Sequence, residues 1–208
     1  MIGICFFDAG AVITALKFNK IEPNMSWFSR KPTQQKYVEA AVTVASNLFL
    51  HTIPGAEDAP APLQFGLPDS RYRYMIFCLS TVATAALVYD EKKNIQPQAL
   101  LEGCLKFATW TATEHAEQYF DDPTSPQDSI NNTTAYFQEL LNHWSRWPEL
   151  EKQGKNAEII KLISDMIRTT ESELPAASAD MQRLDSLALS IDCRLPTMRG
   201  ALIELANR

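Results

Sequence analysis

One apolar run near the middle of the chain limits what this sequence can fold into. Residues 74–89 read YMIFCLSTVATAALVY and are apolar on nearly every side of a helix. A helix that is apolar all round is buried on every side. The run is shorter than the roughly 20 apolar residues that cross a bilayer, and it contains hydroxyl side chains. We therefore expect a helix over about residues 70–89 at the centre of a protein core.

Helical periodicity and proline positions divide the rest of the chain into further helices. Proline suits the first turn of a helix, and Pro32, Pro97, Pro175 and Pro196 stand where apolar periodicity begins. Glycine is scarce, with 7 in 208 residues, and long apolar–polar alternation is absent, which disfavours β-structure. We predict an all-α, single-domain bundle of six or seven helices around the central helix. The expected helices span about 32–51, 70–89, 97–120, 129–147, 156–174, 175–191 and 196–208, and residues 149–155, ELEKQGK, are expected to form a polar turn.

The N-terminal segment, residues 1–24, differs from the rest of the chain. It is apolar, but Asp8 interrupts it and no basic residue precedes it, so it is a poor signal peptide. Met25 opens a polar stretch, MSWFSRKPTQQKY, that is typical of the start of a soluble protein. We expect residues 1–24 to be an extension outside the compact fold and residues 25–208 to form the helical domain. A short packed helix or strand at 1–24 is the alternative.

The net charge of −6 lies entirely in the second half of the chain. Residues 1–104 carry nine Lys and Arg against nine Asp and Glu, whereas residues 105–208 carry ten against sixteen. Nucleic acids and anionic membranes are bound by clustered basic residues, and the basic residues here form no cluster larger than a close pair, so both partner classes are disfavoured. None of the four cysteines belongs to a C-x-x-C pair. Cys78 and Cys104 fall inside apolar helical runs and are expected to be reduced, buried thiols, and a cytoplasmic location is expected.

The stretch TATEHAEQYFDDP, residues 111–123, is rich in acids and has no nearby Lys or Arg on its C-terminal side. On the helix expected over about 97–120, side chains divide between two faces, and His115 falls on the core face. The apolar residues of that face are Leu101, Cys104, Leu105, Ala108, Ala112 and Tyr119. The outer face carries Trp110, Glu114, Glu117 and Asp121. Like charges at this spacing repel, and the helix dipole disfavours acids near a C-terminus. We interpret these four residues, the acidic stripe, as a surface that binds a basic protein through charge and a tryptophan anchor.

A metal or cofactor is not expected at the acidic stripe. His115 turns inward, and carboxylates along one straight helix do not wrap a calcium ion. The Glu-x-x-His spacing of di-iron bundles is absent, and we expect Glu139 and His143, four residues apart, to be a solvent-facing pair. No P-loop, G-x-S-x-G, G-x-G-x-x-G or H-E-x-x-H motif is present. The sequence therefore assigns no catalytic residue, no metal site and no cofactor.

Two functions from different classes fit these observations. The first is a non-catalytic cytoplasmic protein that binds a basic protein partner, as an immunity-like neutraliser of a toxin or nuclease or as an adaptor. The second is a helical enzyme with a pocket beside the central helix. Its polar groups would be His115, Arg71, Arg73 and Thr84. A deep pocket converging on His115 favours the enzyme, whereas a flat surface around Trp110 favours the binding protein.

Overall fold

Every regular element that the structure describes is an α-helix, which confirms the all-α prediction. The computed structural model describes residues 33–52, 68–88, 94–114, 125–170 and 178–208, and side chains in these ranges except those of 68–71 and 178–183. All of them belong to one compact unit, residues 32–208. The extension expected at residues 1–24 lies outside the described residues.

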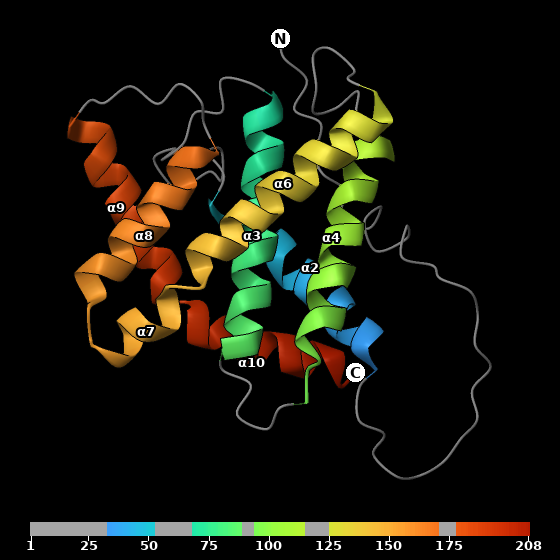
Figure 1. Ribbon diagram of the computed structural model, residues 1–208. Coiled ribbons are helices and arrows are strands. Elements are labelled where there is room, and N and C mark those ends of the chain that lie inside the picture. Colours follow the sequence, from blue (N-terminus) through green and yellow to red (C-terminus); the bar gives the residue numbers. More distant parts are fainter. Residues whose placement is uncertain (1–32, 53–67, 89–93, 115–124, 171–177) are drawn as a thin grey trace. The chain divides into compact units, whose positions relative to one another are not determined.

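Eight helices occur in the described ranges, and seven of them correspond to the helices expected from the sequence (Figure 1). Their bounds are α2 Gln34–Thr52, α3 Pro68–Val88, α4 Pro97–Glu114, α6 Pro126–Trp144, α7 Trp147–Lys152, α8 Asn156–Thr169, α9 Ser178–Asp192 and α10 Leu195–Ala206. Helix α7 is the additional one. It lies in a segment that the sequence suggested to be a polar turn.

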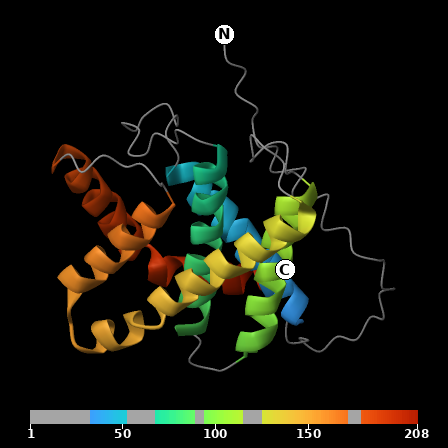
Figure 2. The ribbon, with the colours of Figure 1, turned by 45° about the horizontal axis from the view of Figure 1, so that its top comes forward.

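Helix α3 lies at the centre of the bundle, as its sequence predicts (Figures 1 and 2). It packs against α2, α4, α6, α8 and α10, and no side chain from Tyr72 to Val88 is exposed. The buried hydroxyl groups of Ser80 and Thr81 are satisfied within the helix, because both donate to the carbonyl oxygen of Phe77, at 2.8 and 2.7 Å. In the described part of the chain, no helix combines the length and the apolar character that crossing a membrane requires.

Helix α2 is buried over an unusually broad face. Two neighbouring apolar stripes run along it, and together they pack against α3, α4 and α10. The buried apolar side chains are Tyr37, Ala40, Ala41, Val42, Val44, Ala45, Leu48 and Phe49. A helix with so wide an apolar face has to contact more than one neighbour, and α2 therefore links three helices of the bundle.

Local chemistry explains where α6 and α7 begin. The Ser125 hydroxyl accepts a hydrogen bond from the Asp128 backbone N–H at 3.2 Å and donates to its carboxylate at 2.6 Å. This cap starts α6 at Pro126, three residues before the expected start at Ser129. Pro148 lies in the first turn of α7, where proline is favourable, and the side chains of Trp147 and Leu150 are buried. These buried residues turn an expected turn into a short helix.

Helix α8 ends earlier than its sequence suggested. The expected end was Leu174, whereas α8 ends at Thr169. The hydroxyl groups of Thr169 and Thr170 each donate to a backbone carbonyl within the last turn, at 2.7 and 2.6 Å. Such side-chain hydrogen bonds compete with continuation of the helical ladder, which accounts for the early end. Helix α9, Ser178–Asp192, lies where the helix of about 175–191 is expected.

Candidate functional site

The outer face of α4 presents an aromatic side chain beside a carboxylate. Trp110 has 37% of its surface exposed, and Glu114, one helical turn further along, is also exposed. The ring of Phe107 lies on the inner side of this position, with its centroid 6.0 Å from that of Trp110 and the two planes tilted by 40°. The tryptophan is therefore supported by a neighbouring ring and still reaches solvent.

Trp110 and Glu114 point toward solvent because the opposite face of α4 is buried against the bundle. Cys104, Ala108 and Ala112 are buried, as the sequence predicts, and α4 packs against α2, α3 and α6. Leu101 and Leu105, expected on the core face, are only half-buried, whereas Leu100 is fully buried. The buried face is thus rotated slightly from the expected one, on a helix that packs against three neighbours. The rotation leaves the exposure of the outer face unchanged.

Only part of the acidic stripe can be placed. Trp110 and Glu114 lie in the described end of α4, whereas Glu117, Asp121 and the inward-facing His115 lie outside the described residues. No ion pair of Glu114 occurs in the described part of the chain. Lys106 is exposed one turn before Trp110, so the same face carries one cation on the N-terminal side of the tryptophan. The sequence interpretation did not take this lysine into account.

Of the four residues of the alternative enzyme pocket, only Arg73 and Thr84 have described side chains, and the structure does not bring these two together. The guanidinium carbon of Arg73 lies over the ring of Tyr136, 5.6 Å from the centroid, which is a cation–π contact between α3 and α6. Thr84 is half-buried on α3, and its offset of eleven positions from Arg73 corresponds to about 16 Å along the helix axis. The side chains of Arg71 and His115 lie outside the described residues.

Buried titratable side chains in the core form structural contacts. Burial raises the pKa of the Cys78 thiol well above its usual range and that of Cys104 to about 12, so both thiols stay protonated and unreactive. The Tyr74 hydroxyl, whose pKa is also raised by burial, donates to Thr52 Oγ1 at 2.8 Å. Thr52 in turn donates to the carbonyl oxygen of Leu48 at 2.6 Å. The hydrogen bond between Tyr74 and Thr52 therefore joins α3 to α2.

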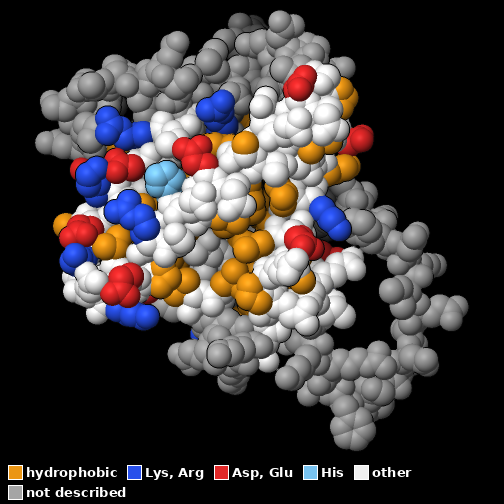
Figure 3. Space-filling model, in the orientation of Figure 1, with side chains coloured by type: hydrophobic (Ala, Val, Ile, Leu, Met, Phe, Trp, Pro, Cys, Tyr) orange, Lys and Arg blue, Asp and Glu red, His pale blue; other side chains and the backbone are white. Residues whose placement is uncertain are grey.

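Other polar side chains on the described surface form ion pairs or lie in mixed charge, and no metal-binding group occurs among them. Nε2 of His143 lies 4.0 Å from Oε1 of Glu139 on α6. The side chain of His143 is half-exposed and that of Glu139 is exposed, which confirms the expected solvent-facing pair. Charges of both signs are mixed over α7 and α8, while hydrophobic side chains gather nearer the middle of this face (Figure 3). Among the described residues, no three His, Cys, Asp or Glu side chains are placed to hold a metal ion.

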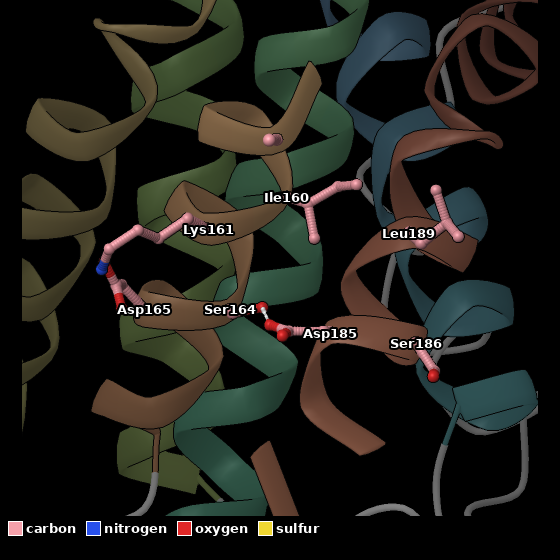
Figure 4. A pocket seen from close by; sticks show the side chains of 8 residues that line it. Ile160, Lys161, Ser164, Asp165, Asp185, Ser186 and Leu189 are labelled. Atoms are coloured by element: carbon pink, nitrogen blue, oxygen red, sulfur yellow. Dashed lines mark hydrogen bonds and ion pairs between the residues drawn. The ribbon is translucent and has the colours of Figure 1, made fainter. Parts of the chain in front are cut away.

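A groove between α8 and α9 has no clear sign in the sequence. Its volume is about 550 Å³, and polar and apolar side chains from both helices line it (Figure 4). Leu189 on α9 is 48% exposed, whereas Leu187, Ala188 and Ile191 on the same helix are buried. A leucine outside the buried stripe of its helix is the only local signal that could have pointed to this groove.

Comparison with protein-family models, with curated proteins and with solved structures gave no match to this chain.

Proposed function

We propose that this chain is a non-catalytic protein that binds a basic protein partner through the outer face of α4. The observation that carries the proposal is the exposed Trp110 beside the exposed Glu114 on a helix whose opposite face is buried in the core. Tryptophan is the side chain most enriched among residues that dominate binding energy. A carboxylate one turn away favours a partner that presents Lys or Arg around an apolar pocket.

The charge distribution of the sequence supports the same class of partner. The second half of the chain, which includes α4 from Leu105 onward, holds the whole net charge of −6. Long-range attraction by such a surface speeds encounter with a basic protein, while the tryptophan contributes short-range affinity. The neutralisation of a basic toxin or nuclease, or an adaptor role for a basic client, uses such a surface. The buried, protonated thiols of Cys78 and Cys104 are compatible with the cytoplasmic location that we propose.

The test is affinity for a partner captured from native lysate and identified by mass spectrometry. Trp110→Ala should weaken binding of that purified partner by about 30-fold, which corresponds to about 2 kcal/mol. Leu50→Ala is the matched control, because Leu50 is 39% exposed on α2 and lies outside the acidic stripe. The free energy of unfolding should change by no more than about 0.5 kcal/mol in either variant. Equal affinity of the Trp110→Ala and wild-type proteins would contradict the proposal.

Charge reversal separates the electrostatic contribution from that of the tryptophan. Glu114→Lys combined with Glu117→Lys should mainly slow association and flatten its dependence on salt, with a smaller effect on dissociation. Stopped-flow or surface plasmon resonance measurements at two ionic strengths distinguish these effects. If divalent metal ions raise the melting temperature, and Glu117→Gln abolishes that rise, the stripe is a metal site instead.

A further inference from the structure

The groove between α8 and α9 has two layers, and each layer consists of one residue from α8 and one residue from α9. Ile160 and Leu189 form an apolar layer, and Ser164 and Asp185 form a polar one. Ser164 follows Ile160 by four residues on α8, and Asp185 precedes Leu189 by four residues on α9. The two layers are therefore separated by about one helical turn, or roughly 5–6 Å. Such an arrangement presents an apolar contact and a polar contact at a fixed spacing.

The apolar layer is open to a ligand. Leu189 is 48% exposed, which makes it more exposed than Trp110 or Leu50 among the large hydrophobic side chains that the structure describes. Ile160 points from α8 toward α9 (Figure 4) and is half-buried. An aliphatic side chain placed between these two residues would remove apolar surface from water on both helices, and this removal favours binding.

The polar layer carries an uncompensated negative charge. Ser164, only 2% exposed, donates its hydroxyl hydrogen bond to Asp185 Oδ1 at 2.8 Å and so holds the carboxylate in place. In the residues that the structure describes, Asp185 has no Lys or Arg within ion-pair distance. Lys161 is bound to Asp165 at 2.8 Å on the side of α8 that faces away from α9 (Figure 4). The described charged side chains that line the groove, Lys161, Asp165 and Asp185, therefore sum to −1.

We propose that this groove binds a helical segment of a partner protein that presents an aliphatic side chain one turn away from a Lys or Arg. The aliphatic side chain lies between Ile160 and Leu189, and the cation binds the remaining oxygen of Asp185. The proposal rests on the proposed function for the class of partner, a basic protein. It assigns a second surface, separate from the outer face of α4, so either surface can be shown to bind without the other.

The experiment is selection of a phage-displayed library of helix-forming 15-residue peptides on the full-length chain. Peptides with an aliphatic residue and a Lys or Arg three or four positions apart should be enriched. The selected peptide is then synthesised with a fluorescent label, and its affinity is measured for the wild-type protein and four variants. Leu189→Ala and Asp185→Asn should each weaken binding by about tenfold. Asn retains the acceptor for Ser164, so Asp185→Asn removes the charge with little change in the helix contact.

Leu50→Ala is the control and should bind the selected peptide as the wild type does, and Trp110→Ala reports whether the peptide binds the outer face of α4 instead. Failure to enrich any peptide, or enrichment of acidic peptides, would overturn the proposal. So would a peptide whose affinity falls in Trp110→Ala but not in Leu189→Ala, and that result would support the α4 surface alone. If Leu189→Ala converts a dimer into a monomer in analytical ultracentrifugation, the groove is covered by a second copy of the chain and the proposal is wrong.

Discussion

Asp192 is the last residue of α9, and its surroundings raise the pKa of its carboxyl group. Partial burial is the larger cause, and the nearby carboxylate of Glu151 adds to it. A pKa that is higher in the folded than in the unfolded chain means that the folded protein binds this proton more tightly. Ionised Asp192 therefore destabilises the fold. This effect is absent below about pH 4, where Asp in the unfolded chain is also protonated, and it grows as the pH rises through the raised pKa.

Replacing Asp192 by asparagine should consequently raise the melting temperature at neutral pH and leave it nearly unchanged near pH 4. Thermal unfolding followed by circular dichroism at both pH values measures this difference. Asp165→Asn is the matched control, because it removes an exposed carboxylate that pairs with Lys161 at 2.8 Å. The control should change stability only slightly, and in the destabilising direction. A lower melting temperature for Asp192→Asn at neutral pH would mean that the carboxylate makes a stabilising contact.

At the scale of helices, α4 has a glycine, Gly103, where it packs against Val38 of α2. A Cβ atom added at Gly103 would lie 2.4 Å from Cγ2 of Val38, a distance that real Cβ atoms essentially never show. Val38 is β-branched and has few other rotamers available in a helix. The absent side chain of Gly103 therefore permits the spacing of these two helices, which offsets the low helix propensity of glycine.

Gly103→Ala should lower the free energy of unfolding by about 1 kcal/mol or more, since overpacking outweighs the gain of up to about 1 kcal/mol from helix propensity. Urea denaturation measures the change. Gly200→Ala in α10 is the control, because a Cβ atom there has no neighbour within 4 Å, and it should stabilise by roughly 0.5–1 kcal/mol. In a Val38→Ala background the Gly103→Ala change should become neutral or stabilising. A loss of the same size in both backgrounds would rule out the steric explanation.

At the scale of the whole molecule, the helical fold follows largely from local signals. The apolar run of α3 predicts a central helix because only a buried helix can be apolar all round, and α3 has no exposed side chain from Tyr72 to Val88. The outward direction of Trp110 and Glu114 was also predictable, because helical periodicity fixes the angle between them and Cys104 or Ala108 on the buried face. Periodicity within one helix is sufficient for such predictions.

Features that depend on two helices meeting were not predictable in the same way. The groove requires Ile160 to lie opposite Leu189 and Ser164 opposite Asp185, and no local pattern specifies that pairing. The choice of Leu100 over Leu101 as the fully buried residue of α4 likewise depends on its neighbours α2, α3 and α6. Short helices such as α7 are missed for the same reason, because their stability comes from the burial of side chains such as Trp147.

The contribution of residues 1–24 to the stability of the whole molecule stays a prediction. Asp8 interrupts their apolar run, and burying an ionised carboxylate without a partner is unfavourable. We expect a protein that starts at Met25 to remain folded, with a melting temperature lowered by roughly 2–4 °C, equivalent to about 1 kcal/mol. Deleting residues 202–208 is the contrasting control, because Leu202 and Ala206 of α10 are buried and α10 packs on α2 and α3. That deletion should lower the melting temperature much further. If the protein starting at Met25 is insoluble or melts as low as the control, residues 1–24 belong to the core.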